Sequence, residues 1–128
     1  MLVFLLLDFF PFSFGGKITT QSLVLPVVLF FKALLFGGIE EIGWRYFFQP
    51  TLEEKIPYLS ATLITFLAWS SWHLFYFYID GSLAVIQLLP FLVGLFINCF
   101  ILSALYHKTQ NLWICVMTHA CINSLSQI

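Results

Sequence analysis

Apolar and polar residues alternate in long blocks along this chain. Four apolar blocks can be drawn as membrane spans, at residues 20–48, 58–79, 83–106 and 112–128, with polar connections at 49–57, 80–82 and 107–111. A straight transmembrane helix needs about 20 apolar residues. Helices are expected because backbone polar groups in lipid must find partners within their own segment. The pattern therefore predicts an all-α, multi-pass transmembrane helical bundle of about four spans.

Two features in the first third of the chain do not fit a simple membrane span. Residues 1–14 are apolar, but they are short for a full span and lack the basic start and cleavage site of a signal peptide. This short N-terminal segment fits half of a broken helix, an interfacial segment or the remnant of a longer parent. Within block 20–48, Pro26 and the pair Gly37 and Gly38 predict a kink or a break. We expect a single membrane-embedded domain, residues 1–128, in a truncated or minimal form of a larger fold.

The composition supports an integral membrane protein. Of the 128 residues, 61% are hydrophobic and only 9% are charged, whereas a soluble domain carries roughly 25% charged residues. The net charge of −1 and the lack of a basic stripe give no indication of nucleic-acid binding, and we expect no nucleic-acid partner. The expected surroundings are membrane lipid, in the cell membrane of a bacterium or the endoplasmic reticulum membrane of a eukaryote. The sequence does not indicate an oligomeric state.

Three ionisable residues lie inside the apolar stretch GGIEEIGWRYFF, at Glu40, Glu41 and Arg45. An unpaired carboxylate near the centre of a membrane helix costs about 2.5–3.5 kcal/mol on insertion scales. Glu41 and Arg45 are four residues apart, so they share one helix face and can form an ion pair. Glu40 lies on another face and needs a different explanation. The alternative is a helix-end cluster whose side chains reach the lipid headgroups.

Two further blocks carry polar side chains that lipid disfavours. His73 lies among aromatic residues, and His119 and Asn123 are four residues apart on one helix face. Taken singly, His73 fits a hydrogen-bonded packing residue, and the other two fit hydrogen bonds between helices. Taken together with the carboxylates, they are suited to hydrolysis of a peptide bond by activated water. A carboxylate and an imidazole can take the proton of water, and imidazole and amide groups can donate to an oxyanion.

Three short segments resemble the motifs of a known family. EEIGWR at 40–45 matches EExxxR, WSSWH at 69–73 matches aromatic-xxx-His with Trp where Phe is usual, and HACIN at 119–123 matches His-xxx-Asn. In this order, they are similar to the CAAX protease and bacteriocin-processing family, also called the Abi family, of intramembrane glutamic endopeptidases. The resemblance is to its Ras-converting CAAX prenyl endopeptidase type and covers residues 35–124.

The resemblance implies a metal-independent intramembrane endopeptidase. Six residues would form its catalytic site: Glu40, Glu41, Arg45, His73, His119 and Asn123. Glu40 would activate water as the general base, with help from His73. His119 and Asn123 would form the oxyanion hole, while Glu41 and Arg45 would orient the site. The substrate would be a membrane-associated peptide or a prenylated protein.

Two other functions remain open at this point. One is a bacteriocin self-immunity protein of the same family, and the other is a catalytically inactive membrane protein left by truncation. A carboxylate with two histidines could bind zinc, but the chain has no HExxH segment, so we expect no metal and no other cofactor. Cys99, Cys115 and Cys121 lie in apolar blocks without metal-ligand spacing, and we expect them to be small buried residues.

Overall fold

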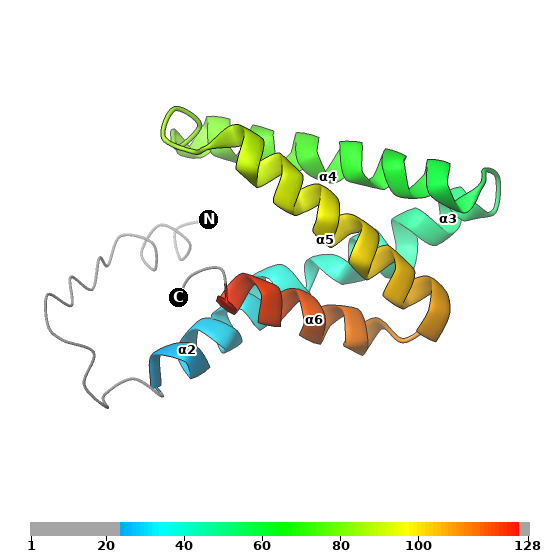
Figure 1. Ribbon diagram of the computed structural model, residues 1–128, viewed down its shortest axis with the longest axis horizontal. Helices are drawn as coiled ribbons and strands as arrows, with labels where there is room; N and C mark the ends of the chain where they lie inside the picture. Colours follow the sequence, from blue (N-terminus) through cyan, green and yellow to red (C-terminus); the bar gives the residue numbers. More distant parts are fainter. Residues whose placement is uncertain (1–23, 126–128) are drawn as a thin grey trace, which may run out of the picture.

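A computed structural model describes residues 24–125, and the side chains of residues 27–125. Every regular element in this part of the chain is a helix, as the apolar blocks predicted (Figure 1). The N-terminal apolar stretch 1–14, the first residues of block 20–48 and the last three residues of the chain lie outside the described residues.

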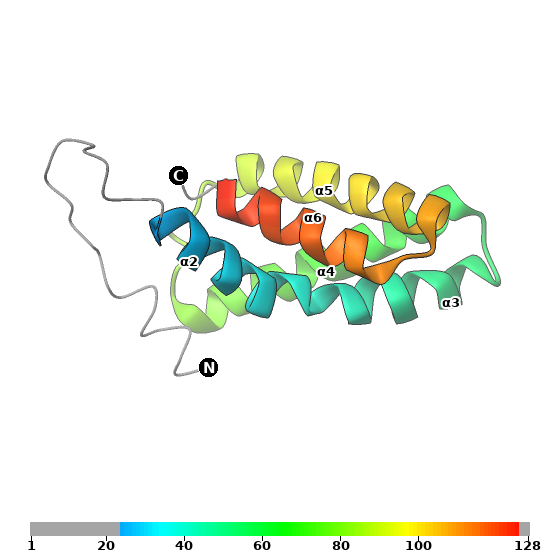
Figure 2. The ribbon, with the colours of Figure 1, turned by 90° about the horizontal axis from the view of Figure 1, so that it is seen from below.

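The first block forms one long helical run with changing pitch. Four segments follow one another in it, α2 (Val24–Ala33), η1 (Leu34–Gly38), η2 (Ile42–Phe48) and α3 (Gln49–Glu53). η1 and η2 are π-helical, with wider turns closed by i→i+5 hydrogen bonds. Ile39 and Glu41 between them keep helical backbone angles. The kink or break predicted at the glycine pair is therefore a widening of the helix, which continues through this region (Figure 2).

The predicted loop at 49–57 is mostly helical, because α3 continues to Glu53. The prediction rested on polar composition, but Gln49 is buried and its amide contacts neighbouring helices. Its polarity therefore marks an internal contact instead of a loop. Block 58–79 is confirmed as α4 (Tyr58–Asp80). Gly81 ends this helix with φ 79°, a left-handed conformation that glycine adopts without steric cost.

The third block begins later than predicted, since α5 spans Leu88–Thr109. The connection before it is 81–87 instead of 80–82, and within it the Ser82 carbonyl accepts hydrogen bonds from two backbone N–H groups. Pro90 explains the late start, because proline lacks an N–H donor and is tolerated in the first turn of a helix. The last block forms α6 (Leu112–Leu125), separated from α5 by two residues.

η2 lies at the centre of the helical arrangement. It contacts α4, α5 and α6, while the preceding segments α2 and η1 pack along α6. α5 also packs against both α4 and α6 (Figures 1 and 2). The segment that carries Glu40, Glu41 and Arg45 is therefore surrounded by the helices that carry the other candidate residues.

Two adjacent glycines allow α6 to approach η1 closely. A Cβ atom at Gly38 would lie 2.8 Å from Val116 Cγ1 and 3.3 Å from the Val116 carbonyl oxygen. A Cβ at Gly37 would lie 2.7 Å from Asn123 Nδ2 and 3.3 Å from His119 Nε2. Small residues at such crossings let helix backbones pack in contact. The glycine pair thus brings the motif on α6 to the first motif.

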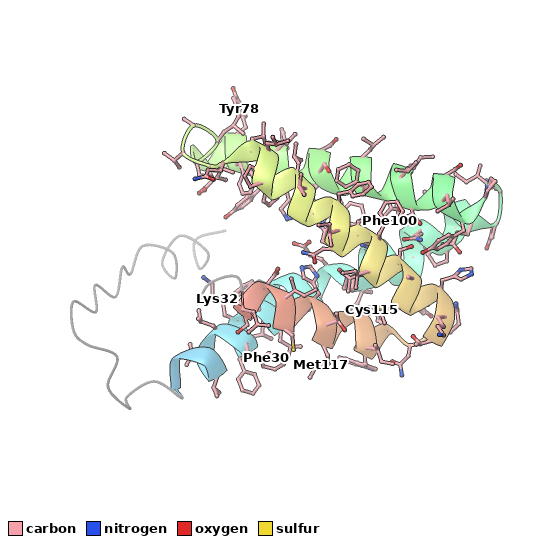
Figure 3. The ribbon with its side chains drawn as sticks, in the orientation of Figure 1. Phe30, Lys32, Tyr78, Phe100, Cys115 and Met117 are labelled. Atoms are coloured by element: carbon pink, nitrogen blue, oxygen red, sulfur yellow. The ribbon has the colours of Figure 1, made fainter. Side chains whose placement is uncertain are left out.

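Buried positions include polar as well as apolar residues, and many large apolar side chains on the long helices are exposed. The buried polar residues include Gln49, Thr62 and Ser103. Figure 3 shows Tyr78 projecting away from the helices and Cys115 lying between them. Cys99 and Cys115 are buried as expected, but Cys121 is exposed. Among the described helices, α5 has the length and apolar composition to cross a membrane.

Replacing Gly38 by Ala tests the close contact between η1 and α6. We expect the new methyl group to push against Val116 and to lower the free energy of unfolding by about 1–3 kcal/mol. Gly94→Ala on α5 is the matched control, because its Cβ would meet no atom within 4 Å. Thermal unfolding of both variants in detergent measures the difference. Equal melting temperatures would contradict the proposed contact.

Candidate active site

Glu41 is the most enclosed carboxylate of the described residues. It is fully buried between η1 and η2, and its Oε1 accepts a hydrogen bond of 2.8 Å from His119 Nδ1 on α6. Its Oε2 lies 3.4 Å from Arg45 Nε, in the ion pair that the spacing predicted. The second contact lacks hydrogen-bond geometry, since neither of its two atoms has a hydrogen-bond partner among the described residues. One carboxylate thus joins two helices.

Arg45 is buried in full, so its side chain does not extend to the lipid headgroups, and the helix-end alternative is wrong. Its Nη2 donates a hydrogen bond of 3.5 Å to the Cys99 carbonyl oxygen on α5. Its guanidinium carbon lies 5.1 Å from the centre of the Trp69 ring on α4, within the range of a cation–π interaction. Removing one partner of such a buried ion pair typically costs 3–5 kcal/mol. Arg45 therefore ties η2 to α4 and α5.

Glu40 faces α4, away from its neighbour Glu41. The indole Nε1–H of Trp69 donates a hydrogen bond of 3.0 Å to Glu40 Oε2. This bond orients one of the two carboxylate oxygens of Glu40. The separate face that the sequence predicted for Glu40 therefore has a specific neighbour.

His73 lies one turn beyond Trp69 on α4, with its Nδ1 3.0 Å from the Trp69 carbonyl oxygen. A carbonyl oxygen only accepts hydrogen bonds, so we assign the proton to Nδ1. In the neutral ring, Nε2 then carries the lone pair and can act as a base.

Glu40 and His73 line one cavity of about 540 Å³ between η1 and α4. Most of its other lining is aromatic or aliphatic, including Phe36, Trp72 and Phe77. A largely apolar cavity with a few convergent polar groups is the common form of a ligand site. The two residues predicted to activate water thus line one largely apolar cavity.

His119 and Asn123, both on α6, approach the helical run of the first motif at Gly37. Both direct nitrogen atoms toward Gly37, three residues before Glu40, but neither is part of the cavity lining. The structure therefore brings Glu40 and His73 together at the cavity. It groups Glu41, Arg45 and His119 in the buried interior, with Asn123 beside them near Gly37.

Trp69 joins the two groups, although the sequence assigned it no chemical role. It donates to Glu40, lies under Arg45, and packs edge-on against His73 and His119, with ring centres 5.7 and 5.4 Å away. The available signal was its place as the first residue of the second motif, four residues before His73. Gln49 was also missed, because its polarity was interpreted as part of a loop.

The positions of the His, Cys, Asp and Glu side chains were compared with what a metal site requires. Within residues 24–125, no group of three or more His, Cys, Asp or Glu side chains has the geometry to hold a metal ion. Glu41 and His119 are instead directly hydrogen-bonded to each other.

Comparison with known proteins identifies the family of this chain. The family model for type II CAAX prenyl endopeptidases, Rce1-like, matches residues 21–125. CAAX prenyl protease 2 of Methanococcus maripaludis is 28% identical over 71 residues, which cover 56% of this chain and 26% of that relative. The chain thus aligns with about a quarter of the relative's length. No solved structure matches the chain. Because the family match covers most of the chain and all three motifs, the chain belongs to the Rce1-like family of type II CAAX prenyl endopeptidases.

Proposed function

We propose that this chain is a multi-pass integral membrane endopeptidase of the CAAX prenyl protease type. It hydrolyses a peptide bond of a membrane-associated, prenylated protein with water activated by a glutamate. One observation carries the proposal: Glu40 and His73 line the same apolar cavity, and Trp69 is hydrogen-bonded to both.

The membrane setting is supported by where apolar and polar groups lie. Large apolar side chains are exposed on each long helix, for example Phe75 on α4, Leu89 on α5 and Trp113 on α6. The buried positions include an unusual share of polar and charged groups. Lipid tails would cover the apolar exterior, and polar groups in such an interior are expected to pair with one another. We therefore retain about four spans as part of the proposal.

In the proposed reaction, Glu40 is the general base. Trp69 holds its Oε2, so Oε1 takes a proton from water while the hydroxide attacks the carbonyl carbon of the scissile bond. The proton that Glu40 takes from water then passes to Nε2 of His73, which delivers it to the leaving amine. A carboxylate and an imidazole can thus perform the hydrolysis without a covalent intermediate.

His119 and Asn123 stabilise the oxyanion in this proposal. Their nitrogen atoms converge on Gly37, in the helical run that leads to Glu40. Because Nδ1 of His119 donates to Glu41, its Nε2 can also donate only when the ring carries both protons. Glu41 balances the charge of that imidazolium, and Arg45 holds Glu41. Such preorganised donors typically contribute 10²–10³-fold to the rate.

Two observations support a prenylated substrate. The cavity wall is mostly aromatic and aliphatic, which suits an apolar chain attached to a peptide. The family match and the relative both carry the description of a prenyl endopeptidase or protease. They favour prenyl-protein processing over the bacteriocin self-immunity alternative.

Substitution of Glu40 by Gln and of His73 by Phe tests the assigned base. We expect each change to lower kcat by at least about 10²-fold, the usual contribution of general acid–base catalysis, with the fold retained. Cleavage of a farnesylated peptide in liposomes measures activity, and thermal unfolding measures the fold. Glu54→Gln, at an exposed position, is the matched control. Full activity of Glu40→Gln would refute the mechanism, and inactive wild-type protein would favour the inactive alternative.

Trp69→Phe tests the orientation of Glu40. Phe keeps an aromatic ring near Arg45 but removes the Nε1–H donor. We expect kcat to fall by about tenfold or more, because a hydrogen bond to a charged group contributes about 1.5–3 kcal/mol. Trp113→Phe at an exposed position of α6 is the control. Equal activity of the two variants would show that the indole donor is not needed.

Chelators test the metal-independent mechanism. We expect EDTA and phenanthroline to leave the cleavage rate unchanged, because the proposal assigns water activation to Glu40 and His73. The rate is measured on the farnesylated peptide before and after incubation with each chelator. Loss of activity that added zinc restores would instead establish a metal mechanism.

A further inference from the structure

A second polar cluster lies one helical turn beyond the Glu41–Arg45 pair. Glu41, Arg45, Gln49 and Glu53 recur every four residues from the N-terminal cap of η2 to the end of α3. The first three of these side chains are buried, and Glu53 is partly buried. This polar stripe therefore extends from the candidate site to the end of the helical run.

The amide nitrogen of Gln49 contacts oxygen atoms from three helices. Its two N–H groups are shared among three acceptors, Glu53 Oε1 on α3 at 2.8 Å, Thr62 Oγ1 on α4 at 3.2 Å, and Ser103 Oγ on α5. Thr62 Oγ1 and Ser103 Oγ lie 2.9 Å apart, so these two acceptors are adjacent. Gln49 thus links the helix that carries the first motif to α4 and α5.

The partners of the two hydroxyl groups support this orientation of the amide. Thr62 donates to the Tyr58 carbonyl oxygen at 2.9 Å, and Ser103 donates to the Tyr58 hydroxyl at 3.1 Å. With their protons so used, both hydroxyl oxygens accept from Gln49 Nε2. Gln49 Oε1 is buried without a hydrogen-bond partner among the described residues. The link between the helices therefore depends on the amide nitrogen.

The register of this cluster matches that of Arg45. Arg45 contacts the carbonyl of Cys99, and Gln49 contacts the side chain of Ser103, each pair separated by 54 residues. Two contacts with the same offset mean that the η2–α3 run and α5 advance in the same direction, one turn per contact. A slip of this run against α5 would break both contacts. The Cys99 thiol also donates to the Thr62 carbonyl at 3.7 Å, which joins the two levels.

Arg45 needs such an anchor because its own contacts are long. Its ion pair with Glu41 measures 3.4 Å and its hydrogen bond to the Cys99 carbonyl 3.5 Å. It also lies in the π-helical segment η2, whose wider turns are less regular than those of an α-helix. The contacts of Gln49, one turn away, would prevent η2 from rotating about its axis.

We propose that Gln49 is a positioning residue for the active site and acts through Arg45. Its amide fixes the register of η2 and α3 against α4 and α5, which holds Arg45 against Glu41 and so keeps Glu41 on His119. The catalytic consequence rests on the function proposed above. The structural consequence, the contact between Glu41 and His119, does not depend on it.

Gln49→Met tests the proposal, because methionine keeps the shape of the side chain but lacks the amide donor. We expect kcat for the farnesylated peptide to fall about 10- to 100-fold, the range that a displaced catalytic group can cost, with KM unchanged. Gln87→Met, at an exposed position before α5, is the matched control. A change in KM alone, or equal kcat values for the two variants, would overturn the proposal.

A double-mutant cycle shows whether Gln49 acts through Arg45. Arg45→Lys keeps the positive charge but loses the planar guanidinium. We expect Gln49→Met to reduce kcat little further in the Arg45→Lys background, because both changes disturb one network. Additive effects would refute action through Arg45. If Gln49→Met does not fold, Ser103→Ala removes one acceptor of the same cluster, and the same non-additivity with Arg45→Lys is required of it.

A spectroscopic measurement separates this inference from the proposed function. The proton between His119 Nδ1 and Glu41 should give a downfield proton NMR resonance, assigned by its loss in His119→Gln. We expect Gln49→Met to shift or broaden this resonance, while Gln87→Met leaves it unchanged. If the wild-type chain cleaves nothing, this result still supports the positioning role. An unchanged resonance in folded Gln49→Met would overturn the role whether or not the chain is active.

Discussion

The structure depends on a buried carboxylate, Glu41, that is shared between Arg45 and His119. Each of these groups would be costly to bury alone in an apolar interior, and together they offset that cost. The pairing also joins the helical run of the first motif to α6. Their burial therefore requires that η2 and α6 meet in one relative position. The close approach of α6 at Gly37 and Gly38 is the steric condition for that position.

Trp69 connects this buried group to the cavity where we place the chemistry. Its ring lies against Arg45 and His119, while its N–H group binds Glu40 and its carbonyl contacts the imidazole of His73. The Glu41–Arg45 ion pair thus contacts α4 through Trp69 and α6 through His119. In the proposed enzyme, it does not react with substrate but sets where the base can lie.

The helices were largely predictable, because apolar runs of this length in a chain with few charges have few other folds. The helix boundaries were less predictable where one residue type fits both a loop and a helix. Gln49 and Pro50 have the composition of a loop, yet they lie in a helix whose polar contacts are internal. Leu83 begins an apolar run, but the helix starts only at Leu88, just before Pro90. The burial of Gln49 explains why α3 continues through the polar segment, and the position of Pro90 in the first turn explains where α5 begins.

The sequence by itself determined the helical class, the three motifs and the Glu41–Arg45 pair, which follow from hydropathy, residue identity and spacing along one helix. The tertiary structure alone decided that Glu40 binds Trp69, that Glu41 binds His119 and that Gln49 links three helices. These contacts depend on the rotation and register of neighbouring helices. Two π-helical segments alter that rotation between the glycine pair and α3, and local spacing does not reveal them.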